Sequence, residues 1–574
     1  MKRTFAICVL LTLLTAGGAA VSCDAPHAKA PAASASKALF DYFNYAGSDD
    51  FYAENPLTDD AAFYNPILPG WYSDPSVCTN GEGDYFLATS TFTYFPGVPL
   101  FHSRDLVNWK QVGHILDRPS QLVNMVGQHV SGGIFAPAIA YNPHNKTYYM
   151  ITTNVGAGNF FVKTQDPFGA WSDPISLPTV RGIDPSFFFD DNGRAYIVNN
   201  DDAPGDKPEY PGHRTIRIRE FDVENDCTIG PEVILVNKGV RPQEKPIWIE
   251  GPHMYKIDGK YFLMSAEGGT SNWHSEVIFR GDQPMGKFTP WTQNPILTQR
   301  HLDPKRPNPI TCAGHADLIQ TVEGDWWAVF LACRPINGNF ENLGRETFLM
   351  PVKWSDDGFP YMTQGEGLIP AIVRREGVTR GEEVTFGNFE RNDDFGAPEL
   401  GMEWLTLRAP AAALWSLTEA PGYLSLACSP VKASQRDVPA FVGRRMQHHK
   451  FTCTTRMIFD PSDAANRAGV LLFKDEQHQY FLAAGNRDGG KNVALYKVGA
   501  DGEEILASEP LGSEVQMLEL MVESKGLSYD FSYAAEPGKW QLLCKDVDAR
   551  YLSTEEAGGF TGTLIGMYAD RTEE

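Results

Sequence analysis

The sequence predicts an all-β protein in which a five-bladed β-propeller is followed by a β-sandwich. Three observations lead to this prediction: many Gly and Pro residues, a strand–turn–strand phrase that recurs five times, and a change of pattern near residue 386. The chain has 53 Gly and 40 Pro among 574 residues, which is typical of many tight turns between short strands. Because the chain is too long for one ordinary domain, two or three domains are expected.

The recurring phrase is a strand, a tight turn containing Gly, Asp or Asn, and a second, aromatic strand, a strong hairpin signal. The five first strands begin near residues 73, 135, 184, 250 and 314. Their key residues are Asp74, Phe135, Asp184, Glu250 and His315, at steps of 61, 49, 66 and 65 residues. Each step has room for four short strands, so five copies indicate a five-bladed propeller. Since blades are arranged radially, the key side chains are expected to face one central pocket.

Three of these key residues are carboxylates, which suit the hydrolysis of glycosides. That reaction needs one carboxylic acid to protonate the leaving oxygen and one carboxylate to activate water or attack the sugar. A third carboxylate can tune the pKa of the acid. Asp74, Asp184 and Glu250 supply this set. An Asp before Pro is usually a turn residue, and the Asp-Pro pairs at 166–167, 173–174 and 303–304 lack the hairpin phrase that follows Asp74 and Asp184.

Other pocket candidates each have more than one interpretation. His315 is a packed core histidine, a substrate contact, or part of a site for a hydrated metal ion on the propeller axis. Arg345 either pairs with an acid or binds substrate hydroxyls, for which its planar guanidinium is suited. Phe92, Phe135 and Trp248 are either ordinary core residues or apolar walls on which sugar rings stack.

The charge and motif content exclude several classes of function. The chain carries 49 basic and 72 acidic residues, a net charge of −23, which disfavours nucleic acid and anionic membrane surfaces as partners. It contains no phosphate-binding P-loop, no dinucleotide-binding glycine fingerprint and no GxSxG nucleophile elbow. A neutral, hydroxylated ligand is the expected partner.

The N-terminus predicts export. Two basic residues precede the apolar run 5–14, and small residues follow over 16–22, the pattern of a cleaved signal at 1–22. Cys23 comes directly after these small residues, as in a bacterial lipoprotein signal, where the thiol is diacylated; the alternative is a plain signal with an incidental cysteine. We therefore expect an exported bacterial protein, in the periplasm or as an outer-membrane lipoprotein, whose only membrane contact is the lipid anchor.

Apart from Cys8 and Cys23, the chain has seven cysteines, which are scattered and show no CxxC or Cys/His pattern. This argues against a zinc site, so no metal ligands are assigned and mostly buried free thiols are expected. No cofactor is expected to be required, and a structural calcium ion near His315 is left open.

The domain boundaries follow from the patterns. Residues 23–59 are interpreted as a tether and lead-in segment and residues 60–385 as the propeller. After about residue 385 the hairpin phrase disappears, and alternating runs such as 469–473 and 479–483 predict sandwich strands over 386–574.

Several ordered segments resemble the glycoside hydrolase family 43 enzymes, the inverting β-xylosidases and α-L-arabinofuranosidases. In the propeller the matching segments are 65–76, 90–98, 102–109, 182–186, 250–253, 266–270, 313–316 and 343–347. The similarity continues through 443–448 and 468–470, as in the two-domain branch of the family, whose second domain is a lectin-like (concanavalin A-like) sandwich.

The resemblance implies a role for each matching residue. Asp74 corresponds to the general base, Glu250 to the general acid, and Asp184 to the residue that orients Glu250 and modulates its pKa. Inversion implies that the carboxyl groups of Asp74 and Glu250 stand ~6.5–9.5 Å apart. The matching sugar-pocket residues are Phe92, Thr270, His315, Arg345 and, from the sandwich, Phe560. The family often has Trp at the position of Phe135 and an acidic residue at that of Ala138, so one pocket wall differs here.

The resulting hypothesis is an exo-acting glycosidase that removes terminal pentoses from plant cell-wall xylan or arabinoxylan by inversion. Xylose and arabinofuranose remain open as the released sugar. The alternatives are a non-catalytic surface protein that binds glycans and a purely structural propeller–sandwich scaffold.

Overall fold

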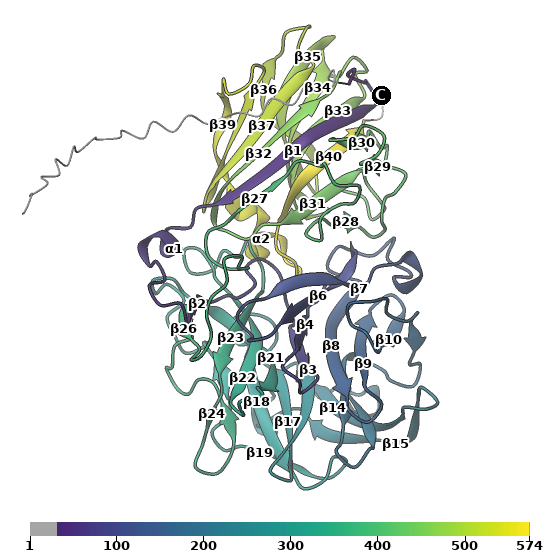
Figure 1. Cartoon of the computed structure of the whole chain (residues 1–574), viewed down its shortest axis with the longest axis vertical. Coiled ribbons are helices and arrows are strands. Elements are labelled where there is room, and N and C mark those ends of the chain that lie inside the picture. The colour runs from purple at the N-terminus through teal and green to yellow at the C-terminus, as the bar shows by residue number, and fades with distance from the viewer. Residues whose placement is uncertain (1–30, 573–574) are drawn as a thin grey trace, which may run out of the picture. The chain divides into compact units, whose positions relative to one another are not determined.

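The computed structural model describes residues 31–572 and consists almost entirely of β-strands (Figure 1). The predicted all-β class is therefore confirmed. In the described residues, the α-helices are the short α1 (Asp50–Glu54) and α2 (Thr554–Ala557). Single 3-10 turns occur at Pro119–Gln121, Pro204–Asp206, Pro242–Glu244 and Ala549–Leu552. None of the helices in residues 31–572 has the length and apolar character needed to cross a membrane.

Five antiparallel sheets form the propeller blades. The first contains β3 (Ser76–Thr79), β4 (Tyr85–Ala88), β6 (Gly97–Ser103) and β7 (Lys110–Leu116). The second contains β8 (Ile134–Asn142), β9 (Thr147–Asn154), β10 (Gly158–Thr164) and β11 (Ile175–Ser176). The third contains β12 (Ile183–Phe189), β13 (Ala195–Asp202), β14 (Arg214–Asp222) and β15 (Cys227–Asn237). The fourth contains β16 (Glu250–Ile257), β17 (Lys260–Glu267), β18 (Ser275–Gly281), β19 (Phe288–Pro290) and β20 (Leu297–Thr298). The fifth contains β21 (Thr311–Gln320), β22 (Trp326–Cys333) and β23 (Glu346–Pro351).

The fifth blade is completed by the segment that enters the propeller. The side chain of Asn65 donates to the carbonyl of Leu349 at 2.9 Å and accepts from its N–H at 3.0 Å. Just before it, β2 (Ala62–Tyr64) pairs with β26 (Ile372–Arg374). The start of the propeller is thereby joined to its end, which closes the ring of blades. A further two-stranded pair consists of β24 (Lys353–Trp354) and β25 (Pro360–Tyr361).

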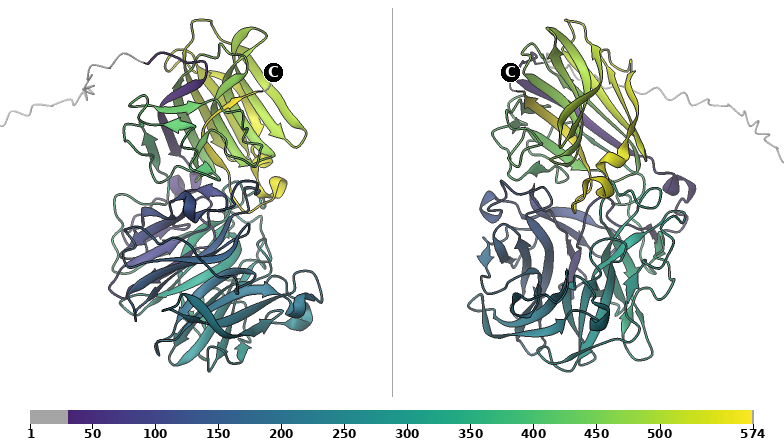
Figure 2. Two further views of the ribbon diagram at one scale, coloured as in Figure 1. Left: turned by 90° about the vertical axis from the view of Figure 1, so that its right-hand side faces the viewer. Right: turned by 180° about the vertical axis from the view of Figure 1, so that it is seen from behind.

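The C-terminal domain is a sandwich of two antiparallel sheets packed face to face around one core (Figure 2). One sheet contains β29 (Trp415–Ser416), β30 (Leu424–Ala427), β1 (Lys37–Gly47), β32 (Lys450–Ile458), β37 (Met517–Lys525), β38 (Ser528–Ala534), β39 (Gln541–Asp548) and β27 (Glu390–Asp393). The other contains β31 (Phe441–Arg445), β40 (Leu564–Arg571), β33 (Asn466–Asp475), β34 (His478–Arg487), β35 (Gly490–Gly499) and β36 (Gly502–Pro510).

Strand β1 corrects the interpretation of residues 23–59 as a tether and lead-in segment. It lies between β30 and β32 in the sandwich sheet, although more than 300 residues separate it from both in sequence. Phe40 and Phe43 are both buried in the sandwich core, yet their spacing breaks the two-residue alternation of a regular strand. A bulge between Phe40 and Tyr42 restores the inward orientation, and this irregularity hid the strand in the sequence.

The propeller and the sandwich share a hydrophobic cluster. Trp71 and Tyr94 of the propeller are buried with Phe441 and Leu564 of the sandwich. The guanidinium of Arg445 lies 4.1 Å from the ring centre of Trp71, and its Nε donates to the Trp71 carbonyl at 2.9 Å. In addition, β5 (Tyr94–Phe95) pairs with β28 (Thr406–Leu407). These contacts fix sandwich residues beside the propeller segments that line the pocket.

Candidate active site

A cavity of about 330 Å³ lies where the first strands of the blades converge. The residues that line it are Asp74, Phe92, Phe135, Ala136, Ile183, Asp184, Trp248, Glu250, Gly269, Thr270, His315, Arg345 and Phe560. The structure thus brings together every pocket residue predicted from the sequence. Cys23, the predicted lipidation site, lies outside the described residues.

The backbone at the cavity has the same unusual conformation in all five blades. At corresponding places near the start of its first strand, each blade has a residue with a positive φ: Asp74 (54°), Ala136 (33°), Asp184 (52°), Gly251 (54°) and His315 (52°). For the four non-glycine residues this left-handed conformation costs roughly 1–2 kcal/mol each, and such strain is concentrated at functional sites.

This pattern corrects the predicted register of two blades. The recurring phrase predicts that Phe135 and Glu250 are equivalent to Asp74, but the equivalent residues are Ala136 and Gly251. Phe135 and Glu250 therefore precede the left-handed residue by one position and still line the cavity. A side chain at position 251 would place a Cβ 2.9 Å from the ring of His315, so close packing at the axis requires glycine there.

Asp74 is buried, with 6% of its surface exposed, and its carboxylate is held by three groups. Its Oδ1 accepts from Arg345 Nη1 at 2.9 Å, and its Oδ2 accepts from the hydroxyl of Ser90 at 2.6 Å. Nδ1 of His315 lies 3.7 Å from the same Oδ1. Burial alone would raise the pKa of Asp74. The positive charge of Arg345, the nearby imidazole of His315 and the hydrogen bond from Ser90 together outweigh burial and lower this pKa below its usual value. Asp74 is therefore an anion at neutral pH.

Glu250 has the opposite environment. It is the first residue of β16, and only 7% of its surface is exposed. Burial and then the charges of Asp184 and Asp74 raise the pKa of Glu250 well above its usual value. This environment favours the protonated form of Glu250, which is the form that can donate a proton.

Asp184, the third carboxylate of the cavity, has a raised pKa, like Glu250 and unlike Asp74. Its Oδ2 accepts from the N–H of Gly251, the residue after Glu250, at 3.1 Å. Burial, followed by repulsion from Asp74, raises the pKa of Asp184 to about 7, while the Gly251 N–H and Arg214 act in the other direction. Through this hydrogen bond Asp184 holds the backbone beside Glu250, and through its charge it raises the pKa of Glu250.

Three phenylalanines form one wall of the cavity. The rings of Phe92 and Phe135 meet edge to face with centres 5.6 Å apart. Phe560, which comes from the sandwich, lies 6.3 Å from Phe92 and 5.7 Å from Phe135. Its N–H donates to the hydroxyl of Ser131 at 2.9 Å, which holds the loop against the propeller. Such apolar ring faces suit the C–H faces of a sugar.

Phe560 and Arg345 lie near the point where the propeller segment with Gly344 passes close to the sandwich segment with Gly562. The guanidinium of Arg345 lies 5.4 Å from the ring centre of Phe560. A Cβ on Gly344 would come within 2.7 Å of the backbone nitrogen of Gly562, and a Cβ on Gly562 within 2.3 Å of the carbonyl of Leu343. The glycines therefore allow a propeller segment and a sandwich segment to meet at the site.

Two residues that act on the site were not identified from the sequence. Arg214 on β14 stacks on Trp248, with its guanidinium 4.8 Å from the ring centre, and its charge lowers the pKa of both Asp184 and Glu250. It belongs to no recurring motif, so only the fold reveals it. Ser90 lies in a segment used for the family resemblance, but its hydrogen bond to Asp74 crosses 16 residues and has no signal in the sequence.

His315 lines the cavity at 7% exposure, and burial lowers its pKa to about 4, so its imidazole is neutral. Calcium prefers six to eight oxygen ligands. In residues 31–572, His315 belongs to no group of three or more His, Cys, Asp or Glu residues whose ligand atoms lie within 4.8 Å of one another. The side chains supply no direct cage for calcium, and a hydrated ion near His315 stays a prediction.

Comparisons with known proteins agree with the residue-level resemblance. The model of glycosyl hydrolases family 43 matches residues 63–360, and that of the β-xylosidase C-terminal concanavalin A-like domain matches residues 392–574. A non-reducing end α-L-arabinofuranosidase of Bacteroides ovatus is 35% identical over 88% of this chain and 91% of its own. A xylosidase/arabinosidase of Butyrivibrio fibrisolvens is 37% identical over 88% of this chain and 95% of its own. The crystal structure of a GH43_12 protein from a capybara gut metagenome has a TM-score of 0.86 at 42% identity, covering 93% of this chain and 100% of that one.

Proposed function

The chain belongs to glycosyl hydrolase family 43, and from this premise we propose that it is an exo-acting glycosidase that releases terminal β-D-xylosyl or α-L-arabinofuranosyl residues by inversion. One observation carries the proposal. Asp74 and Glu250 line the same cavity, and their pKa values are shifted in opposite directions. An anionic base beside a protonated acid is the pair that glycoside hydrolysis requires.

In this mechanism Asp74 accepts a proton from water as the water attacks the anomeric carbon. Glu250 donates its proton to the departing glycosidic oxygen. Asp184 keeps Glu250 protonated until the bond breaks, because its charge penalises the glutamate anion. Arg345 keeps Asp74 ionised and holds its carboxylate in place.

The size and lining of the cavity favour attack at a chain end. Its volume of about 330 Å³ is near the lower limit of pockets that enclose small molecules, about 300–1,000 Å³. A site of this size, walled by Phe92, Phe135 and Phe560, suits one terminal sugar better than the middle of a polymer.

The names of the relatives support a pentose as that sugar, because they are an α-L-arabinofuranosidase and a xylosidase/arabinosidase. We infer that the natural substrates are plant cell-wall oligosaccharides such as those of xylan or arabinoxylan. The alternative of a non-catalytic glycan-binding protein is less well supported, because all three carboxylates remain in the pocket.

Hydrolysis of a panel of aryl glycosides tests the proposal. We expect turnover of β-D-xyloside, α-L-arabinofuranoside or both, release of single pentoses from branched arabinoxylan oligosaccharides, and little action on aryl hexosides. Glu250→Gln should lose more activity on oligosaccharides than on aryl glycosides with good leaving groups, because a good leaving group departs without being protonated. Glycan binding without release of any sugar would overturn the proposal.

We also propose that the protein is exported and anchored by a lipid on Cys23. The support is the sequence of residues 1–23, which lie outside the described residues. Expression in a bacterial host should give a membrane-bound form whose mass includes diacylglycerol. Cys23→Ser should abolish this mass increase and release the protein; an unlipidated wild-type protein would contradict the proposal.

A further inference from the structure

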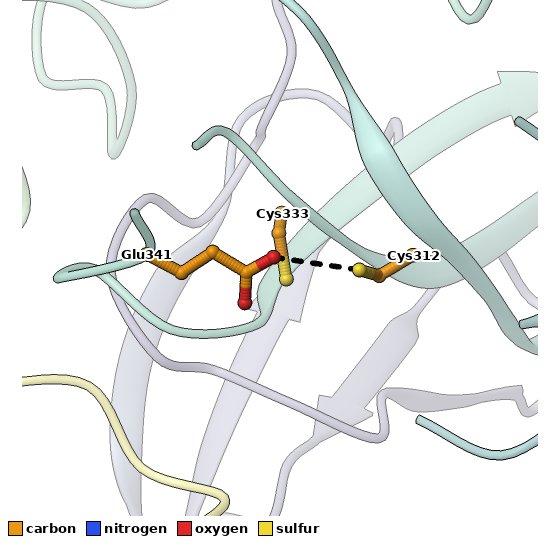
Figure 3. A group of neighbouring side chains, drawn as sticks. All are labelled: Cys312, Cys333 and Glu341. Carbon is orange, nitrogen blue, oxygen red and sulfur yellow. Dashed lines mark hydrogen bonds between the residues drawn. The ribbon is translucent and has the colours of Figure 1, made fainter. Parts of the chain in front are cut away.

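Outside the catalytic carboxylates, two thiols and a carboxylate converge in the fifth blade (Figure 3). They belong to Cys312 on β21, Cys333 at the end of β22, and Glu341 in the loop before β23. Their ligand atoms lie within 4.8 Å of one another, and the thiol of Cys312 donates to Oε1 of Glu341 at 3.4 Å. The ladder between β21 and β22 is interrupted between Thr311 and Gly314, and Cys312 lies in this interruption with a φ of 56°.

The two thiols are buried, Glu341 is half-buried, and the group borders free space. Cys312 is 4% exposed, Cys333 is fully buried, and both are free thiols. A cavity of about 110 Å³ is lined by Cys312, Glu341, Asn272 and Glu555. The side-chain oxygen of Asn272 lies 3.8 Å from the sulfur of Cys312. A small ion therefore has room beside Cys312 and Glu341 and a further oxygen, that of Asn272, near them.

The geometry and the ligand chemistry suit one kind of ion. Zinc binds thiolate sulfur at about 2.3 Å and carboxylate oxygen at about 2.0–2.2 Å in a tetrahedron, which places the two ligand atoms roughly 3.5 Å apart. The sulfur of Cys312 and the oxygen of Glu341 are already 3.4 Å apart. Thiolates select zinc and softer ions over calcium and magnesium. We propose that Cys312, Cys333 and Glu341 form a binding site for a thiophilic cation such as Zn²⁺, with the fourth position filled from the cavity.

Metal binding at this site should depend on pH, because thiolate and carboxylate ligands bind a metal ion in their deprotonated forms. Burial and then the Glu555 carboxylate raise the pKa of Glu341 to about 7, against the opposing effects of Cys333, Cys312 and Lys474. The hydrogen bond with Cys312, burial and the charge of Glu341 raise the pKa of Cys333 well above its usual value. Because the ligands must be deprotonated to bind, metal binding releases the thiol protons and any proton on Glu341 to solvent, so affinity should fall as the pH falls.

The site is connected to the catalytic pocket. The small cavity is also lined by Arg345 and Phe560, which line the catalytic cavity. Glu341 is held to the sandwich, because its N–H donates to Glu555 at 2.9 Å and its carbonyl accepts from the N–H of Thr554 at 3.2 Å. An ion at Glu341 would restrain the loop that leads to Arg345, and we expect it to raise the melting temperature of the whole chain.

Metal titration of the reduced full chain tests the proposal. Equilibrium dialysis with Zn²⁺ should give one tight equivalent per chain, and Co²⁺ should give the near-ultraviolet charge-transfer band of thiolate ligation. Cys312→Ser and Cys333→Ser should each weaken Zn²⁺ binding at least 100-fold, and Glu341→Gln should weaken it less. Cys227→Ser, which removes an exposed thiol elsewhere, is the matched control and should bind normally. Absence of the thiolate band in the wild-type chain, or unchanged Zn²⁺ affinity in folded Cys312→Ser and Cys333→Ser, would overturn the assignment.

Discussion

At the scale of single residues, the same chemical group acquires different protonation states from its neighbours. Asp74 faces a guanidinium, a hydroxyl and an imidazole, whereas Glu250 faces mainly other carboxylates. The sequence could place three acids at one end of a propeller because each stands at the start of the recurring phrase. It could not assign their protonation, because Ser90 and Arg214 reach the site through tertiary contacts alone.

Replacing Asp74 by Asn removes the base while keeping the shape of the side chain. We expect turnover to fall roughly 10²–10⁴-fold, the contribution typical of a general base, with an unchanged circular dichroism spectrum. Steady-state kinetics on nitrophenyl pentosides measure this. Ser90→Ala, which removes only a hydrogen bond to Asp74, should lose less activity and shift the acidic limb of the pH profile upward. Near-normal turnover by Asp74→Asn would refute its role.

Ionisation of the buried Asp184 carboxyl group should lower the free energy of unfolding at high pH. Its pKa is about 7 in the folded chain and about 3.9 when exposed, so the folded state holds the proton more tightly. The stability from this protonation is complete below about pH 4 and is lost as the pH rises through 7. Asp184→Asn cannot ionise and should therefore be stabilised by on the order of a few kcal/mol at pH 8 and by less at pH 5, while losing activity.

Thermal melts at both pH values measure this difference. Asp258→Asn, in an exposed turn, is the matched control and should melt like the wild-type chain at each pH. An Asp184→Asn variant whose melting temperature rises equally at pH 5 and pH 8 would contradict the raised pKa.

At the scale of elements, irregular backbone positions the site. The left-handed residue at the start of each blade aims side chains at the axis, and its position in the second and fourth blades corrected the predicted register by one residue. Hairpin turns and aromatic strands were visible in the sequence because their signals are local. The bulges in the first strands could not be predicted from the sequence, because they depend on pairing with a neighbouring strand.

The glycine crossing beside Arg345 can be tested by adding one methyl group. Gly344→Ala would place a Cβ 2.7 Å from the Gly562 nitrogen at a φ of 72°, so the two segments must separate and displace Arg345 and Phe560. We expect a higher KM and a lower kcat on aryl pentosides. Gly81→Ala has a comparable φ of 78° but meets nothing within 4 Å, so it should lose some stability and keep its kinetics. Equal kinetic losses in both variants would attribute the effect to backbone strain alone.

At the scale of the whole molecule, the two domains form one functional unit. The sandwich contributes Phe560 to the pocket, and its core includes β1 from the N-terminal side of the propeller. The sequence predicted two domains and the aromatic residue at the pocket, but it could not show that the sandwich is assembled from both ends of the chain. The pairing of β1 with β32 spans about 400 residues, and no local pattern encodes it.

A chain that begins at Asp49 tests this assembly, because it keeps every propeller strand and lacks β1. Removing Phe40, Phe43 and Tyr45 from the core forfeits roughly 1.5–3 kcal/mol for each side chain, a large part of the 5–15 kcal/mol that stabilises a typical domain. We expect a sandwich that is cleaved readily by protease and loss of activity. A chain that begins at Ala33 is the control; equal protease resistance in both would contradict the role of β1.

The stereochemistry of the first-formed sugar tests the proposed chemistry most directly. Proton NMR during the first minutes of hydrolysis, before mutarotation, identifies the anomer that leaves the active site. With Asp74 as base and Glu250 as acid, an aryl β-D-xyloside should give α-xylose first, and an aryl α-L-arabinofuranoside should give the β-anomer. Initial release of the anomer with retained configuration would contradict the assignment of Asp74 as a base that activates water.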